Sequence, residues 1–576
     1  MAERRYEVTL ERNVATPMRD GTVLRADVYR PKADGPFPII LMRLPYDKTG
    51  AITGDYAHPS WYARQGYVVV VQDCRGRWAS EGEWNPFFNE GRDGYDTIEW
   101  AASLPGTVPK VGMYGASYVG LTQIRAAVEA PPHLTCVCPA VTASNYFEGW
   151  TYEGGALHLA FTENWSMFLA TDTARRAGKP EIERMLNKAS GTDSWGWYQY
   201  LPLKDFQPHR EGGMAPYFFD WVEHSTFDDY WKETAPELRY GNVQAQGLHI
   251  AGWYDIFLDG SLKNFAGFGS QGQGAARGGQ RLMVGPWYHY PWTPQVGEIN
   301  FGPSAVGSRV DQTQVRYYNW LLRGEDDGIS AEPPVTLFVM GENVWRSENE
   351  WPLKRAVNTP YYFHSDGYAN SMYGDGTLST TPPTEESHDV YVYEPRGPTP
   401  ARGGHSCCIE WIVPQGPFDQ RPVEMWREVL CYTSEELTAP LEVTGPVKVK
   451  LWAATSAVDT DWVAKLVDVF PDGRAINLTE GIIRARFREG LETPKLLERD
   501  QIAEYEINLR ATSNVFLPGH RIRVDVASAA FPHWDRNPNT GQKLGEATIS
   551  DVESAMQTVF HDGGRPSHII LPVVPR

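Results

Sequence analysis

Long apolar runs are missing from this sequence. A helix that crosses a bilayer needs about 18 or more largely uninterrupted apolar residues, and no segment of the chain supplies them. The N-terminal stretch 1–7 also lacks the apolar core of a secretion signal. The sequence therefore predicts a cytoplasmic protein that has no membrane partner.

Cysteine is scarce as well. Six cysteines in 576 residues do not suggest a disulfide scaffold, and none form the C-x-x-C pairs that zinc sites favour. Cys407 and Cys408 stand near His405, but adjacent cysteines do not easily share one tetrahedral ion. We therefore expect no metal site and no cofactor.

Basic residues are outnumbered by acidic ones. The formal net charge is -19, which repels phosphate backbones and anionic membrane surfaces. No local basic stripe offsets this charge. The sequence therefore predicts no nucleic-acid partner.

The first quarter of the chain alternates short β-branched runs with helical patterns. This alternation is typical of a parallel sheet covered by helices. Two more buried-strand patterns follow after a long interruption, so we expect the sheet to resume there. The expected strands are 38–44, 67–72, 110–114, 247–253 and 281–285, and the expected helices are 94–103 and 118–129.

The remaining segments have different patterns. The interruption is rich in aromatic residues and helix-forming stretches, which indicates a cap over the sheet. Later strands, expected at 447–452, 462–470, 475–487, 505–509 and 520–526, alternate and are separated by turns, which favours a β-sandwich or jelly roll. The predicted α/β architecture has a core at 1–142 and 244–349, a helical cap at 143–243 and a jelly-roll β-sandwich at 350–576.

A serine turn lies where an expected strand meets an expected helix. In the segment Gly115–Gly120, glycines flank Ser117, and such a turn exposes the hydroxyl and aims the following amides at one point. Val119 occupies the position where the second glycine usually stands, and Gly120 comes one residue later. We therefore take Ser117 as a candidate nucleophile that needs partners.

Those partners are expected at the carboxyl ends of the two later strands. Reactive groups gather at this edge of an open parallel sheet, where Asp255 follows the first strand and His289 the second. The chain order Ser117, Asp255, His289 is that of an α/β-hydrolase triad. His249 lies inside a strand pattern, and Asp259 is our second choice for the carboxylate.

Further motifs accompany the triad candidates. They are Arg43–Lys48, Asp73–Arg77, Ser80–Trp84, Gly416–Arg421, Thr512–Phe516 and Gly519–Arg521. Together with the serine turn and the two strand ends, they make the chain resemble, over nearly its full length, the bacterial cocaine esterase family, which is related to X-prolyl dipeptidyl-peptidases and α-amino acid ester hydrolases. The resemblance implies an α/β-hydrolase core, an inserted helical cap and a C-terminal jelly roll. It also implies an oxyanion hole made by the Tyr46 hydroxyl and the Tyr118 backbone amide.

The resemblance also suggests what surrounds the acyl group of a substrate. In the α-amino acid ester hydrolases, acidic residues that follow the catalytic aspartate help to hold an ammonium group, whereas residues 256–258 are apolar here. The cocaine esterase pattern has a phenylalanine two residues after that aspartate and two cap tryptophans. Phe257, Trp150 and Trp165 match this pattern.

The sequence therefore predicts a cofactor-independent serine hydrolase. Its expected partner is a small-molecule carboxylic ester with an apolar or aromatic acyl group, cleaved through an acyl-enzyme intermediate. One alternative is an acylase or X-prolyl dipeptidyl-peptidase that acts on amides. Another is a noncatalytic protein whose C-terminal part binds carbohydrate. The sequence leaves the oligomeric state open, with a homodimer as one option.

Overall fold

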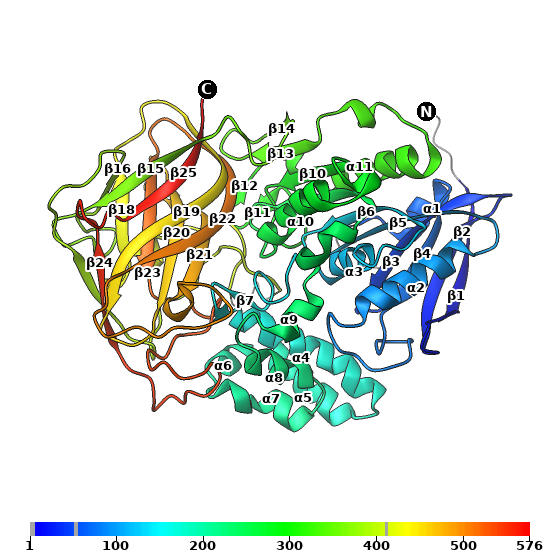
Figure 1. The fold of residues 1–576 in the computed structure, drawn as a ribbon, viewed down its shortest axis with the longest axis horizontal. Helices are drawn as coiled ribbons and strands as arrows, with labels where there is room; N and C mark the ends of the chain where they lie inside the picture. The colour runs from blue at the N-terminus through cyan, green and yellow to red at the C-terminus, as the bar shows by residue number, and fades with distance from the viewer. Residues whose placement is uncertain (1–5, 51–55, 409–412) are drawn as a thin grey trace.

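Two large β-sheets stand side by side, and a group of helices lies along one side of both (Figure 1). The computed structural model describes residues 6–50, 56–408 and 413–576. The N-terminal stretch in which we found no secretion signal therefore lies mostly outside the described residues. Among the described helices, none combines the length and the apolar character that a bilayer crossing requires.

The first sheet has ten strands in the order β1-β2-β4-β3-β5-β6-β9-β10-β13-β14. Neighbouring strands from β4 to β13 pair in parallel, whereas β1, β2 and β14 pair antiparallel to their neighbours. The five strands expected from the sequence are confirmed within a few residues. The bounds are β1 (Val8–Pro17), β2 (Val23–Pro31), β3 (Phe37–Leu44), β4 (Val68–Asp73), β5 (Thr107–Ala116), β6 (Leu134–Ala140), β9 (Gln246–Gly252), β10 (Gln280–Gly285), β13 (Val335–Val339) and β14 (Val344–Glu348).

The inner strands are recognisable because both faces of the sheet are covered. Every residue of β4 is buried, and its Val-rich sequence suits a strand that has no solvent face. The helices of the core include the two that were expected, although one begins at Glu90, four residues before the expected Gly94. The core helices are α1 (Pro59–Arg64), α2 (Glu90–Ala102), α3 (Tyr118–Ala127), α10 (Leu258–Gln271) and α11 (Ser308–Tyr318).

The helical cap is inserted between β6 and β9. Its aromatic side chains form one buried cluster that also takes in Tyr118 and Phe257 from the core and Cys407 and Phe531 from the C-terminal part. The three parts of the chain therefore share a continuous apolar contact. The cap contains β7 (Tyr152–Glu153), β8 (Ala156–Leu157), α4 (Leu159–Arg176), α5 (Pro180–Ser190), α6 (Ser194–Tyr198), α7 (Gln207–Gly212), α8 (Pro216–Glu223) and α9 (Asp229–Thr234).

The C-terminal part is an all-strand jelly roll with its own apolar core. The five strands expected here correspond to β19–β23, but β19 and β22 are much longer than their sequence patterns and pair with each other. The bounds are β15 (Val357–His364), β16 (Thr377–Ser379), β17 (Asp389–Tyr393), β18 (Leu430–Ser434), β19 (Leu441–Thr455), β20 (Asp461–Val469), β21 (Ala475–Arg484), β22 (Ala503–Phe516), β23 (Arg521–Ala527), β24 (Ala555–Phe560) and β25 (His568–Val574). The short elements β11 (Gln295–Val296), β12 (Ile299–Asn300) and α12 (Arg421–Glu424) lie in connecting segments.

Candidate active site

The three predicted triad residues follow strands that are close together in the sheet. Ser117 comes directly after β5, Asp255 follows β9, and His289 follows β10, in a sheet whose order here is β5-β6-β9-β10. Because these strands are parallel, their carboxyl ends meet at one edge. The sheet therefore brings all three segments to the same edge.

Ser117 occupies a strained turn. Its φ is 61° and its ψ is -127°, a backbone conformation that costs a non-glycine residue free energy and is concentrated at functional sites. A Cβ on Gly115 would lie 2.2 Å from Val119 Cγ1, and a Cβ on Gly120 would lie 2.9 Å from the Ala140 carbonyl oxygen. The displaced second glycine is therefore explained by packing: Gly120, not residue 119, faces β6.

Asp255 and His289 are hydrogen-bonded to each other. Their Nδ1–Oδ1 distance is 2.6 Å, and both side chains are buried. The second oxygen of Asp255 accepts a hydrogen bond from the Phe257 amide at 3.1 Å. A carboxylate on Nδ1 fixes the tautomer that leaves Nε2 as a proton acceptor.

The other ring nitrogen of His289 has no partner in the structure. Nε2 is buried and lacks a hydrogen bond within the described residues, so none joins it to Ser117. The competing candidates are engaged elsewhere: Asp259 accepts a hydrogen bond from Asn508 at 2.6 Å, and His249 is bonded to Gln280 at 3.0 Å. The structure thus brings the Asp255 carboxylate and the His289 imidazole together and leaves Nε2 without a hydrogen bond among the described residues.

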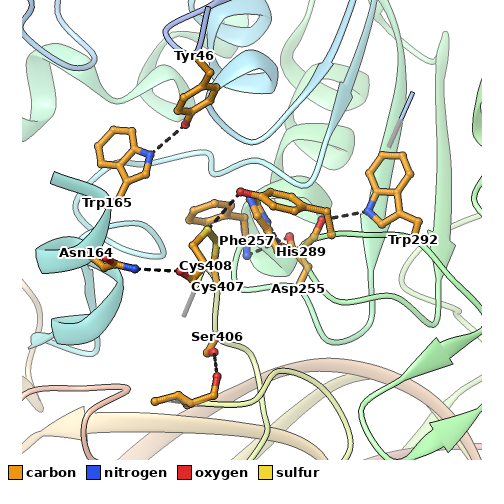
Figure 2. The surroundings of a disulfide bond; sticks show 12 residues. Tyr46, Asn164, Trp165, Asp255, Phe257, His289, Trp292, Ser406, Cys407 and Cys408 are labelled. Carbon is orange, nitrogen blue, oxygen red and sulfur yellow. Dashed lines mark hydrogen bonds and ion pairs between the residues drawn. A yellow bond between two sulfur atoms is a disulfide. The ribbon is translucent and has the colours of Figure 1, made fainter. Parts of the chain in front are cut away.

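Tyr46 lies across from this pair, two residues after the end of β3. Its hydroxyl accepts a hydrogen bond from Trp165 Nε1 at 3.0 Å (Figure 2). Desolvation raises the pKa of Tyr46 far above its ordinary value. The hydroxyl therefore keeps its proton and can donate it to a third group.

Two of the sequence motifs fix the loop that carries Tyr46. Lys48 and Asp73 form a buried ion pair, with Nζ 2.8 Å from Oδ2, and the Lys48 amide also donates to Asp73. Arg77 Nε donates to the Pro45 carbonyl at 3.1 Å. The Asp73–Arg77 motif therefore holds both sides of Tyr46 in place through these bonds to Lys48 and Pro45.

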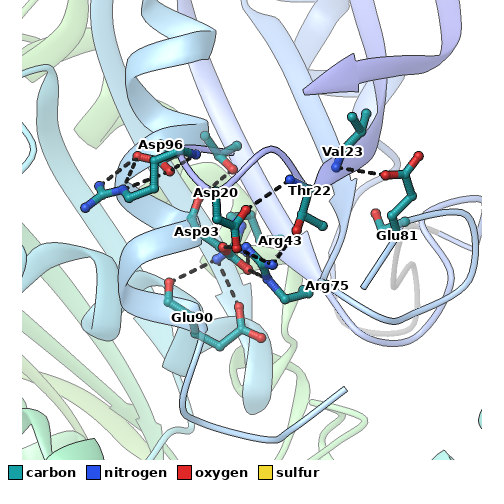
Figure 3. Close-up of polar contacts among 12 residues, drawn as sticks. Asp20, Thr22, Val23, Arg43, Arg75, Glu81, Glu90, Asp93 and Asp96 are labelled. Atoms are coloured by element: carbon teal, nitrogen blue, oxygen red, sulfur yellow. Dashed lines mark hydrogen bonds and ion pairs between the residues drawn. The ribbon is translucent and has the colours of Figure 1, made fainter. Parts of the chain in front are cut away.

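Tyr118 is the first residue of α3, so its backbone amide is at a helix N-terminus, where amides lack helical partners. Its side chain is held in place: the hydroxyl accepts from the Phe87 amide at 2.9 Å and donates to Glu90 at 3.2 Å. Glu90 in turn is ion-paired with Arg43 at 3.0 Å. Figure 3 shows this pair beside the contact of Arg75 with Asp20 and Asp93. Through its bond to Tyr118, Glu90 anchors the start of the helix that follows Ser117.

The three predicted acyl-site residues lie together. Phe257 and Trp150 stack, with ring centroids 4.3 Å apart and planes at 12°. The edge of one ring meets the face of the other between Phe257 and His289 at 5.2 Å, and Trp165 contacts Trp150 at 5.6 Å. A continuous row of rings therefore runs from His289 to Tyr46, which Trp165 contacts.

The jelly roll adds two residues to which the sequence assigned no role. Cys407 and Cys408 form a disulfide, and their sulfurs and a ring nitrogen of His289 all lie within 4.8 Å of one another (Figure 2). His405, the histidine next to them in sequence, turns away and donates to the Trp253 carbonyl at 2.8 Å. The sequence held no signal for this, because the approach depends on how the jelly roll docks.

A separate cavity of about 450 Å³ lies between the cap and the jelly roll. Tyr198, Arg484 and Arg536 are among the residues that line it, and none of the predicted site residues does. Its arginines already have partners, since Arg484 is paired with Asp461 and Arg536 donates to the Pro395 carbonyl. We therefore do not assign the chemistry to this cavity.

Comparison with known proteins gives the family. The chain is 40% identical to cocaine esterase of a Rhodococcus species, and the match covers 98% of each protein. The chain belongs to the cocaine esterase family. Residues 20–291 of this family member match the model of the X-Pro dipeptidyl-peptidase S15 family, and residues 327–570 match that of the X-Pro dipeptidyl-peptidase C-terminal non-catalytic domain.

Solved structures support the same relationship. An α-amino acid ester hydrolase is 26% identical, with a TM-score of 0.82 over 100% of this chain and 98% of that one. An aminopeptidase from a marine-sediment Thaumarchaeota archaeon is 25% identical, with a TM-score of 0.81 over 99% and 97% of the two chains. Together with the 40% identity to cocaine esterase, these matches make this family member a serine ester hydrolase.

Proposed function

We propose that the protein hydrolyses small carboxylic esters with Ser117 as nucleophile, His289 as general base and Asp255 as the group that orients the base. The observation that carries this proposal is the 2.6 Å hydrogen bond between Asp255 and His289, with Nε2 of the same ring lacking a partner among the described residues. The strained backbone of Ser117 at the same sheet edge supports it.

The reaction would run in two halves. Nε2 of His289 takes the proton of Ser117 as the hydroxyl attacks the ester carbonyl, and then gives it to the leaving alcohol. Water, activated by the same nitrogen, cleaves the acyl-enzyme. The Tyr46 hydroxyl and the Tyr118 amide would donate to the oxyanion in both halves, because preorganised donors stabilise charge that develops in the transition state.

The acyl part of the substrate is proposed to be apolar or aromatic. Trp150 and Phe257 stack with each other, and Phe257 also contacts His289, so an acyl group bound near the base would meet ring faces and edges. The residue that follows Asp255, Ile256, is buried and apolar. No acidic side chain follows Asp255 in 256–258 to hold an ammonium group.

Amide hydrolysis is the second candidate. It is favoured by the match of residues 20–291 to the X-Pro dipeptidyl-peptidase family and by the likeness to an archaeal aminopeptidase. Rates on a phenyl ester and on an X-Pro-anilide, measured with the same preparation, separate the two. We expect the ester to have the larger kcat/KM, and a larger value for the anilide would reverse the assignment.

Replacement of the nucleophile tests the mechanism. We expect Ser117→Ala to abolish ester turnover and labelling by a fluorophosphonate, because the proposed mechanism attacks through the Ser117 hydroxyl. Ser270→Ala is a matched control, since Ser270 is exposed on α10 and its hydroxyl donates to the Ala266 carbonyl of the same helix. Unchanged turnover in Ser117→Ala would refute the nucleophile assignment.

The noncatalytic carbohydrate-binding alternative predicts no fluorophosphonate labelling and measurable glycan binding.

The cytoplasmic location and the homodimer stay predictions. Cell fractionation checks the first, and sedimentation velocity checks the second.

A further inference from the structure

The disulfide between Cys407 and Cys408 does little for the stability of the fold. A disulfide stabilises mainly by closing a loop in the unfolded chain, and a bond between neighbouring residues closes almost none. The other four cysteines are free and buried: Cys74, Cys136, Cys138 and Cys431. The role of this bond is therefore to be sought in its surroundings.

The described residues that flank the two cysteines are hydrogen-bonded to several parts of the protein. Gly404 and Gly416 exchange two backbone hydrogen bonds of 2.8 and 2.9 Å. The His405 amide donates to Glu480 of β21 at 3.3 Å, while its ring donates to the Trp253 carbonyl in the core. The cysteines that follow are thus tied to both the jelly roll and the segment that ends in the catalytic aspartate.

The cap contacts the same pair. Asn164 of α4 donates to the Cys408 carbonyl at 3.0 Å, and the Tyr290 hydroxyl lies 3.4 Å from Cys408 Sγ (Figure 2). Cys407 is buried and Cys408 is half-buried. Cys407 is therefore enclosed, whereas Cys408 is partly open to solvent.

Three potential ligand atoms converge here. The two sulfurs and a ring nitrogen of His289 lie within 4.8 Å of one another. Because Nδ1 is engaged by Asp255, the nitrogen left for a ligand is Nε2, which is buried and has no hydrogen bond among the described residues. Thiolate sulfur and imidazole nitrogen are the donors that soft and borderline cations prefer.

We propose that Cys407 and Cys408 in their reduced form, together with His289, bind a soft divalent cation such as Cd²⁺, and that the disulfide closes this site. Two molecules of an external thiol transfer two electrons and two protons to the S–S bond and become a disulfide. Alternatively, one phosphine reduces the bond together with one water molecule, which supplies the oxygen of the phosphine oxide and the protons of the two new thiols. The cation then replaces the thiol protons. Adjacent cysteines suit a closed tetrahedral zinc site poorly, so we expect irregular coordination.

Binding of this cation would switch off the esterase. An imidazole whose Nε2 coordinates a metal cannot take the proton of Ser117. This consequence rests on the proposed function, whereas the binding itself does not. The oxidised protein is expected to be insensitive to the cation, because its sulfurs are bonded to each other.

The test uses the full-length protein in two redox states. One sample is reduced with a water-soluble phosphine and freed of it without oxygen, and the other is left oxidised. Thiol titration after denaturation should give four thiols in the oxidised sample, from the four free cysteines, and six in the reduced one. Six thiols without reduction would overturn the closing role of the disulfide.

Both samples are then titrated with Cd²⁺ while thiolate-to-cadmium absorption in the ultraviolet and ester turnover are followed. We expect the reduced protein to gain this absorption with one Cd²⁺ bound and to lose turnover by about tenfold or more. A chelator should reverse both changes. A reduced protein that gains no absorption would overturn the proposal.

Variants identify the ligands. The double variant Cys407→Ser/Cys408→Ser should lack the absorption and keep its own baseline turnover in Cd²⁺, whereas Cys431→Ala, which removes a buried thiol of β18, should behave as the unmodified protein. His289→Asn should retain the absorption but bind Cd²⁺ about tenfold more weakly or worse. Undiminished affinity in this variant would exclude the histidine as a ligand and overturn the three-donor site.

The two proposals can fail separately. If Ser117→Ala retains turnover while the cadmium absorption is present, the catalytic assignment fails and the metal site stands. If Ser117→Ala is inactive and the reduced protein gains no absorption, only the metal site fails.

Discussion

The core and the jelly roll both deliver side chains to His289, but they do so by different physical means. Asp255 and His289 follow adjacent parallel strands, so their meeting is set by backbone register over a few residues. Cys407 reaches the same histidine on a loop fixed by contacts to Glu480 and Trp253. The contact between Asp255 and His289 therefore depends on the sheet, whereas the approach of the cysteines to His289 depends on how the jelly roll docks.

The largest expected effect tests the contribution of the core and comes from removing the negative charge of Asp255. Asp255→Asn should lower ester turnover about 10⁴-fold, because the amide stabilises the wrong tautomer of His289. Steady-state kinetics check this, with Asp259→Asn as the matched control on the next helical turn, where the carboxylate binds Asn508 instead. Equal losses in both variants would contradict the assignment.

The second-largest expected effect is a fall in kcat when the proposed oxyanion donor, the Tyr46 hydroxyl, is removed. Tyr46→Phe keeps the ring but loses the hydroxyl, and we expect kcat to fall about 10²–10³-fold with little change in KM. Tyr114→Phe is the control, because the Tyr114 hydroxyl is buried and has no hydrogen bond within the described residues. A change in KM alone would make Tyr46 a binding residue rather than an oxyanion donor.

The contribution of the jelly roll is tested through the charge of Glu480 and its effect on the free energy of unfolding. Burial by itself would raise the pKa of this carboxyl, but the nearby His533 and the charge of Lys465 outweigh it and lower the pKa to about 2, below the ordinary value of 4.5. A lowered pKa stabilises the fold above pH 4.5, and this contribution is lost as the pH falls toward 2. We expect it to amount to about 2–3 kcal/mol.

Urea unfolding between pH 5 and pH 3 measures this dependence. Glu480→Gln should flatten the curve in that window, since the amide does not titrate. A variant with the same slope as the unmodified protein would show that another group causes the acid sensitivity.

The smallest expected effect concerns the turn before the cysteines. A Cβ on Gly404 would lie 1.9 Å from Glu480 Oε1, and the φ of this residue is 91°. Gly404→Ala should therefore lower stability by about 1–2 kcal/mol through strain and crowding. Gly241→Ala is the control, because a Cβ there meets nothing within 4 Å and its φ is not positive. Thermal unfolding compares the two, and equal melting temperatures would contradict the prediction.

Much of the fold could be predicted from local pattern. The inner strands of the first sheet were found because a strand covered on both faces is largely apolar, as the four valines that begin β4 show. The start of α2 was missed because its first turn is polar and contains Gly91, and because the Asn89 side chain makes no capping bond. The full lengths of β19 and β22 were missed as well, since their ends are defined by pairing with each other.

Some residues of the candidate site could also be predicted from local sequence, and others could not. Ser117, Asp255 and His289 could be named because glycine placement and strand ends are written in short stretches of sequence, although no hydrogen bond joins Ser117 to His289 among the described residues. The neighbour of Cys407 could not be named. His405 is near the cysteines in sequence but bonds to Trp253, whereas the structure places His289 of the core beside the sulfurs.

The sequence by itself determined the inner strands, the serine turn and the placement of Asp255 and His289 at strand ends. These features depend on residues near one another in sequence and on the fixed direction of the strands in a parallel sheet. Only the tertiary structure decided that two adjacent cysteines lie beside His289, the proposed general base. That contact joins segments more than 100 residues apart, and it follows from the buried apolar cluster that the core, the cap and the jelly roll share.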